Sequence, residues 1–207
     1  YFYPAKDLLF FQADIHGNLL IRQRMQVIRA LLERQEEITV VTSIDGCMDY
    51  LAPLEKIEKQ LIHFRNDSTL DMDKLTAALV HMGYERVGQV EMPGQFSIRG
   101  GIIDIYSLTE ENPWRIELWG DEIDSIRSFD KESQRSIEEV DTLTIYPASE
   151  IILNQPRIEH GLRNMEEDYE KLSQKFKKEK KYDQETRLRK EMDRVRRIIA
   201  DHMVMSK

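Results

Sequence analysis

Two carboxylates in the middle of the chain, Asp104 and Glu117, form the strongest candidate for a catalytic or metal-binding pair in the sequence. Each lies in a strand-like run, and two carboxylates on neighbouring strands could hold a divalent metal ion, as in a nuclease. Such nuclease sheets usually place a lysine two residues after the acid, and here that position is Trp119. Arg115 shares a strand face with Glu117, so we expect these two side chains to pair. A metal-dependent nuclease is therefore kept only as an alternative hypothesis.

The pair Gly100-Gly101 could also do chemistry, because glycine-rich backbone at the start of a helix binds phosphate. The residues that follow, IIDIY, are β-branched and alternating, so they predict a strand and not a helix. The pair therefore predicts a tight turn or a bulge. The chain has no GxxxxGK(S/T) loop, and neither its five histidines nor Cys47 shows zinc-ligand spacing. We expect no cofactor and no metal in this chain.

The chain begins with an α/β pattern. A short apolar run at 7–11 predicts a strand, and apolar residues at helical spacing predict a helix over 17–35. The β-branched run at 38–43 is typical of a buried parallel strand. Ser43 is expected to cap a short helix that ends near Leu51. Residues 1–54 thus predict an α/β fragment that is too short to close a doubly wound domain.

Residues 55–148 predict a small antiparallel sheet that carries one helix. The helix pattern spans 71–84, and turn signals separate strand patterns at 59–64, 85–92, 95–100, 101–107, 114–119, 122–130 and 142–147. In residues 149–207, apolar residues recur three and four apart, which predicts either two helices joined by a hinge or one long helix. The expected fold class is α/β plus α+β, with a helical C-terminal segment.

Strand alternation divides the central residues between two faces of this sheet. Phe96, Ile98, Ile103 and Ile105 are expected to face the core. The outward face then collects Ser97, Arg99, Asp104, Tyr106, Arg115, Glu117 and Trp119, and Arg86 lies before the first strand pair. Arginines and aromatic residues on a rigid sheet are typical of a protein–protein hot spot. A solvated face with ordinary cross-strand ion pairs is the alternative.

The charge distribution argues against a general DNA-binding protein. The first 156 residues carry 15 Lys+Arg against 27 Asp+Glu, a net charge of −12, whereas residues 157–207 carry 15 against 11, a net charge of +4. Affinity for duplex DNA comes mostly from neutralising phosphates, so the acidic body should bind it weakly. No run of about 18 apolar residues exists, so no membrane contact is expected. The single cysteine suits the cytoplasm, and the missing initiator Met suggests an excerpt of a longer protein.

Three phrases together, GQFSIRGGIIDIY, GDEIDSIRSFD and QRSI, resemble the interaction domain shared by UvrB and the bacterial transcription-repair coupling factors. Two features favour the coupling-factor family. Ser97 stands where UvrB proteins carry the first arginine of R-x-R-G, and the stretch FFQADIHGNLLIRQR lacks the aromatic-rich hairpin with which UvrB clamps damaged DNA. The equivalent module of UvrB, a damage-verifying helicase, is the alternative.

The resemblance implies an N-terminal, UvrB-like module that recruits UvrA to RNA polymerase stalled at DNA damage, in transcription-coupled nucleotide excision repair. It implies a partial RecA-like segment at 1–54, a UvrA-interaction domain at 55–148 and a helical return segment at 149–207. RNA polymerase and DNA would bind through the full-length protein. ATP and Mg²⁺ would serve a motor outside this chain, so the fragment is expected not to be an enzyme. The UvrA-contacting positions carry over to Arg86, Arg99, Arg115 and Glu117, and secondarily to Ser97 and Tyr106.

Overall fold

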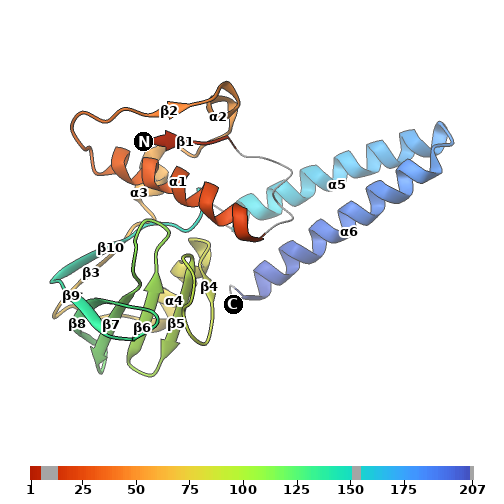
Figure 1. Ribbon diagram of the computed structural model, residues 1–207. Coiled ribbons are helices and arrows are strands. Elements are labelled where there is room, and N and C mark those ends of the chain that lie inside the picture. Colours follow the sequence, from red (N-terminus) through yellow and green to blue (C-terminus); the bar gives the residue numbers. More distant parts are fainter. Residues whose placement is uncertain (6–13, 151–154, 206–207) are drawn as a thin grey trace. The chain divides into compact units, whose positions relative to one another are not determined.

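The computed structural model describes residues 1–5, 14–150 and 155–205 of the chain (Figure 1). They divide into two compact units, Tyr1–Ile152 and Leu153–Lys207, and each is described by itself. Helices alternate with small sheets in the first unit, and the elements described in the second unit are two helices. This confirms the expected fold class of α/β plus α+β with a helical C-terminal segment. The domain boundaries at 54/55 and 148/149 stay predictions, and the strand expected at 7–11 lies outside the described residues.

The N-terminal segment is an α/β fragment, as predicted. Its elements are β1 (Phe2–Tyr3), α1 (Asp14–Leu32), β2 (Val41–Thr42) and α2 (Ile44–Met48). Strands β1 and β2 pair in parallel, but Val41 is 59% exposed, so the prediction of a buried strand at 38–43 is wrong. Within the described residues β2 is a two-residue strand that pairs with β1 in a two-stranded sheet. The cap is confirmed, because the Ser43 hydroxyl accepts a 3.2 Å hydrogen bond from the amide of Gly46.

The α+β part of the first unit follows. Its elements are α3 (Leu54–Glu58), β3 (Ile62–Arg65), α4 (Met72–His81), β4 (Glu85–Arg86), β5 (Gln95–Arg99), β6 (Ile102–Tyr106), β7 (Trp114–Trp119), β8 (Glu122–Phe129), β9 (Ser136–Glu139) and β10 (Thr142–Ile145). One sheet has the order β4-β5-β6-β7-β8-β9, and β3 pairs with β10 in a separate antiparallel sheet. The sequence did not predict α3 or β9. The strand expected at 85–92 is reduced to two residues that pair in parallel with β5.

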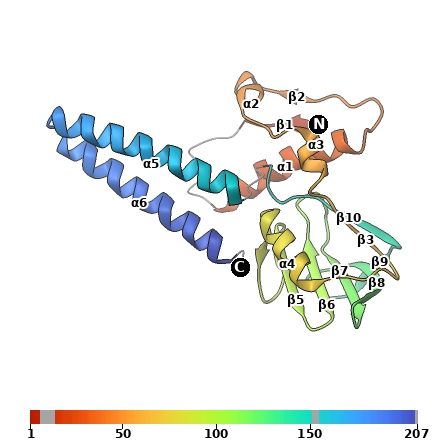
Figure 2. The same cartoon turned by 180° about the vertical axis from the view of Figure 1, so that it is seen from behind.

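Helix α4 covers one face of the six-stranded sheet, where Figure 2 shows it lying across β5 and β6. Leu75 and Leu79 pack in one apolar cluster with Phe96, Ile103 and Ile116, and all five side chains are buried. These sheet residues are members of the alternating sets that the sequence assigned to the core. The core face therefore follows the predicted period of two.

A buried arginine, Arg24, ties the N-terminal segment to the end of the α+β part. Its guanidinium donates to Glu150 at 2.8 and 3.0 Å, to Asp49 at 2.9 Å and to the carbonyl of Pro4 at 2.7 Å. It also lies 4.0 Å from the ring centroid of Tyr3. Burial of that ring, together with the nearby Glu150 carboxylate, raises the pKa of Tyr3 to about 12. No sequence pattern predicted this cluster, because its members are far apart along the chain.

The turn between β5 and β6 confirms the turn predicted at Gly100-Gly101. Gly100 has a φ of +60°, a left-handed conformation that costs a residue with a Cβ atom about 1–2 kcal/mol. A methyl group on Gly100 would meet no atom within 4 Å, and the same holds at Gly88, which lacks a positive φ. These two glycines therefore differ in backbone conformation and not in available space.

We expect Gly100→Ala to lower the free energy of unfolding by about 1 kcal/mol, because of the left-handed φ. Gly88→Ala should leave it unchanged or raise it by a few tenths of a kcal/mol, because alanine restricts the unfolded chain. Urea denaturation of both variants checks this. Equal effects at the two positions would contradict the conformational explanation.

The second unit is a helical hairpin, described by itself. Helices α5 (Gln155–Lys178) and α6 (Tyr182–Met205) run antiparallel, and Lys180 adopts a φ of +56° in the turn between them (Figure 1). Of the two alternatives, the hinged pair is therefore confirmed and the single long helix is wrong. Met192 and Ser173 are buried, and the Ser173 hydroxyl on α5 donates to the carboxylate of Glu185 on α6 at 3.3 Å. Among the described residues, no helix has both the length and the apolar character needed to cross a membrane.

Candidate protein-docking surface

The six-stranded sheet, called the central sheet below, carries two rows of mostly polar residues on the face opposite α4. In the first row, directly opposite residues on five neighbouring strands are Ser97, Asp104, Arg115, Arg127 and Glu139. In the second row they are Arg99, Ile102, Glu117 and Ser125. Because side chains alternate along each strand, residues in these rows share one face. The register thus brings together Arg99, Arg115 and Glu117, as the sequence predicted.

Asp104 is the centre of an ionic cluster on this face. Its side chain is 1% exposed. Arg115 donates to Oδ1 at 2.7 Å through Nε and to Oδ2 at 2.9 Å through Nη2. Arg99 donates to the same Oδ2 at 2.8 Å, and its own side chain is 48% exposed. Asp104 therefore holds Arg115 in a bidentate pair and Arg99 through a single hydrogen bond.

Arg115 is held from further directions. Its guanidinium lies 4.2 Å from the ring centroid of Phe129 and donates to Oε1 of Gln134 at 2.9 Å. The hydrogen bonds to Asp104 raise the pKa of Arg115. The expected pair between Arg115 and Glu117 is wrong, because Asp104 stands directly opposite Arg115 on the neighbouring strand. Only 15% of the Arg115 side chain remains exposed.

Glu117 pairs instead with Arg127, a residue that the sequence did not single out. Arg127 on β8 donates to Glu117, and the hydroxyl of Ser125 lies 3.3 Å from the same carboxylate. A shift in register between β7 and β8 places both Ile123 and Ile126 in the core, which breaks strict alternation along β8. Strict alternation along β8 that starts at the buried Ile123 would place Arg127 on the core face. The sequence pattern therefore did not indicate that Arg127 lies on the outward face.

Part of this face is covered by loops. Tyr106 is buried in a small cluster with Val90 and Phe129, and its hydroxyl donates to the carbonyl of Glu111 at 2.7 Å. Ser97 is also buried, and its hydroxyl donates to the carbonyl of Gly88 at 3.0 Å. The expectation that Tyr106 lies on an open face is therefore wrong, because the loop between β4 and β5 folds over this part of the sheet.

The open part of the face is defined by Arg99, Glu117, Trp119 and Arg127, and we call it the docking surface. Trp119 is 84% exposed, and the two ionic side chains of the Glu117–Arg127 pair are each about one-third exposed. Arg86 is exposed on β4, at the edge of the sheet. Contact of these residues with a partner stays a prediction.

The chemistry required of a metal-dependent nuclease is not supported at Asp104 and Glu117. Both oxygens of Asp104 already accept hydrogen bonds from guanidinium groups, and Glu117 is paired with Arg127. Arginines this close would repel a divalent cation. Within the described ranges, no three side chains of the metal-binding types are grouped closely enough to hold an ion.

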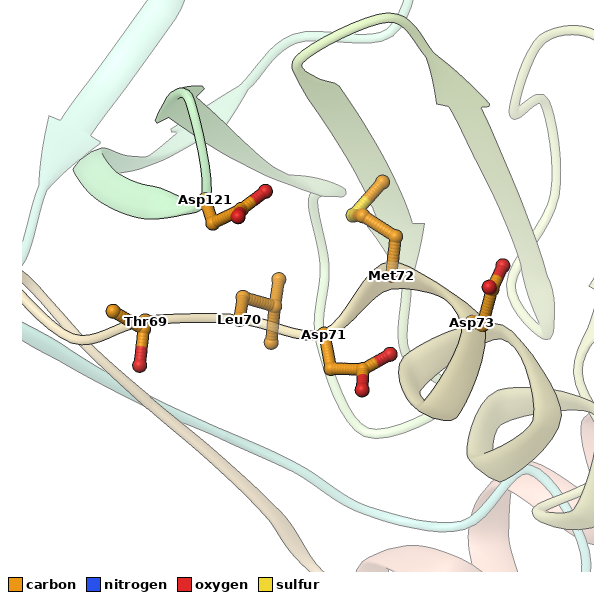
Figure 3. A pocket seen from close by; sticks show the side chains of 6 residues that line it. All are labelled: Thr69, Leu70, Asp71, Met72, Asp73 and Asp121. Atoms are coloured by element: carbon orange, nitrogen blue, oxygen red, sulfur yellow. The ribbon is translucent and has the colours of Figure 1, made fainter.

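A shallow pocket at the start of α4 is also acidic but has a structural explanation. It has a volume of about 450 Å³ and is lined by Thr69, Leu70, Asp71, Met72, Asp73 and Asp121 (Figure 3). Asp71 caps α4 by accepting from the amide of Lys74 at 3.1 Å and forms an ion pair with the Lys74 ammonium at 2.9 Å. These bonds lower the pKa of Asp71, as expected of an N-cap.

Comparisons with known proteins give the family context of this surface. Residues 62–151 match the UvrB interaction domain family, a range that contains the whole docking surface. A transcription-repair-coupling factor of Bacillus subtilis (strain 168) is 42% identical over 178 residues, which are 85% of this chain and 15% of that protein. The proteins of the same name from Staphylococcus aureus (strain USA300) and Staphylococcus haemolyticus (strain JCSC1435) are 35% and 34% identical over 178 residues.

This chain covers 15% of the length of each of these relatives. The resemblance of the three sequence phrases is confirmed: residues 62–151 match the UvrB interaction domain family, and the chain is similar to one module of the transcription-repair-coupling factors.

Proposed function

We propose that this chain is a protein-interaction module that binds UvrA and thereby recruits it to RNA polymerase stalled at damaged DNA. The match to the UvrB interaction domain supports an interaction role, and the coupling-factor relatives support the repair context. The observation that carries the proposal is the half-exposed Arg99, held by a buried carboxylate on a rigid sheet inside the matched range. The module needs no catalytic group of its own for this task.

The charges of the docking surface fit an acidic site on UvrA. Arg99 and Arg115 with Asp104 carry a net charge of +1, and Glu117 with Arg127 is neutral. The cluster is thus a positive spot on a part of the chain that is otherwise acidic. An arginine fork can grip a carboxylate through two hydrogen bonds, and the exposed Trp119 adds apolar contact beside it. UvrA is expected to present a carboxylate next to an apolar group.

We expect calorimetric titration of UvrA with this chain to show saturable binding, because Arg99 and Trp119 of the docking surface are exposed. Duplex DNA titrated in place of UvrA should bind weakly, and that binding should fade as salt rises, because the body of the chain is acidic. An absence of heat with UvrA at concentrations up to the limit of solubility would contradict the proposal. Tight binding of DNA at high salt would contradict the assignment of the surface to a protein.

The remaining parts of the proposal concern the whole protein. RNA polymerase and DNA would be engaged by other regions, and ATP and Mg²⁺ would be used by a motor outside this chain. The site of action would be the cytoplasm. Ser97 supports a coupling factor over the damage-verifying helicase UvrB, because the buried hydroxyl occupies the position of an arginine in UvrB. The full-length sequence would decide between the two.

A further inference from the structure

The arginines of the central sheet differ in what they can offer a partner. Arg115 uses Nε and Nη2 in bonds to Asp104 and Gln134, its guanidinium lies over the ring of Phe129, and it is largely buried. Arg99 is half exposed, and its one hydrogen bond within the described residues goes from Nη2 to Asp104. Nε and Nη1 of Arg99 are left to bond another molecule.

Asp104 cannot contact a partner itself, because its side chain is 1% exposed and both of its oxygens are occupied. It can affect partner binding only through the arginines that it holds. Arg99 and Arg115 donate to the same oxygen, Oδ2, so their positive groups are close to each other. Without the negative charge of Asp104 they would repel, and the exposed one would move away.

We infer that Asp104 is the positioning residue of the docking surface: it orients the Arg99 guanidinium for the partner, and Arg115 braces Asp104. The inference rests on the proposed function and adds a division of roles among its residues. A long side chain that is already held loses less entropy when it binds, so the hydrogen bond to Asp104 should strengthen partner binding. Arg115, Phe129 and Gln134 then serve to hold Asp104 in place.

A double-mutant cycle on UvrA binding separates this role from simple support of the fold. In the wild-type background, Asp104→Asn keeps the shape but removes the charge, and it should weaken UvrA binding roughly tenfold. In an Arg99→Ala background, the same substitution should change affinity less than about twofold, because the residue through which it acts is gone. Circular dichroism melts of all four proteins give the stability changes for comparison.

The outcomes are distinct. Equal loss of affinity in both backgrounds would overturn the inference, since Asp104 would then act independently of Arg99. A wild-type chain that binds UvrA while Arg99→Ala binds equally well would overturn both the inference and the choice of docking surface. No binding by the wild type would instead overturn the proposed function itself.

A second measurement stands even if Asp104→Asn does not fold. Side-chain ¹⁵N relaxation of the arginine Nε–H groups in the wild-type chain reports how firmly each guanidinium is held. Arg99 should be clearly more ordered than Arg65, an exposed arginine on β3, and less ordered than the bidentate Arg115. Arg99 motion matching that of Arg65 would overturn the inference, because the carboxylate would then hold nothing in place.

Discussion

The Arg99→Glu variant is expected to lose about 2–5 kcal/mol of UvrA binding free energy, the usual cost of disrupting a charged pair that is buried in a complex. The substitution places a carboxylate where the partner is expected to present one, so attraction becomes repulsion. It also sets a second negative charge beside Asp104, which turns the new side chain away from the sheet. Isothermal titration calorimetry with UvrA measures this loss.

Stability is expected to change little in the same variant, by about 1 kcal/mol or less, because Arg99 is half exposed and such ion pairs contribute little to folding. Arg65→Glu is the matched control, because it makes the same charge change on an exposed strand residue outside the six-stranded sheet. Unchanged affinity in Arg99→Glu with an unchanged melt would show that this face is not the interface. Equal losses in both variants would show that UvrA responds only to net charge.

The Arg24→Met variant is expected to lower the free energy of unfolding by about 3–5 kcal/mol, the range found when one partner of a buried ion pair is removed. Methionine fills much of the volume but leaves the buried carboxylate of Glu150 without its guanidinium. Arg24 also bonds Asp49 and the carbonyl of Pro4, so three separate segments lose a shared anchor. Urea denaturation, followed by tryptophan fluorescence, measures the change.

Arg22→Met is the matched control for this prediction. It lies on the same helix, and the structure gives its side chain one long hydrogen bond of 3.4 Å to the carbonyl of Glu110. Its effect should stay within about 0.5 kcal/mol, as for ordinary surface substitutions. If Arg24→Met were as mild as the control, the charge cluster around Arg24 would be dispensable for folding.

The fold class and the side chains of the core face could be predicted from the sequence. Period-two alternation in β5 and β6 placed Phe96 and Ile103 inward, because a strand that packs one face on a helix must present apolar residues at every second position. The turn at Gly100-Gly101 followed from local chemistry in the same way, as did the cap at Ser43. Specific phrases in these strands also indicated the family, which the comparisons confirm.

The pairing of charged groups could not be predicted from the sequence, because it depends on how the strands are aligned with one another. Arg115 was expected to pair along its own strand with Glu117, but the register of β6 against β7 puts Asp104 directly opposite it. The irregular register of β7 against β8 then brings Arg127 to Glu117.

The burial of Tyr106 on the outward face and the formation of the Arg24 cluster also depend on the tertiary structure. The loop between β4 and β5 covers Tyr106, which lies on β6. Arg24 contacts Glu150, which is 126 residues away in the sequence. Periodicity reports which face of a strand a side chain occupies. Strand register and loop placement determine which groups contact that side chain. Both depend on the packing of the whole unit.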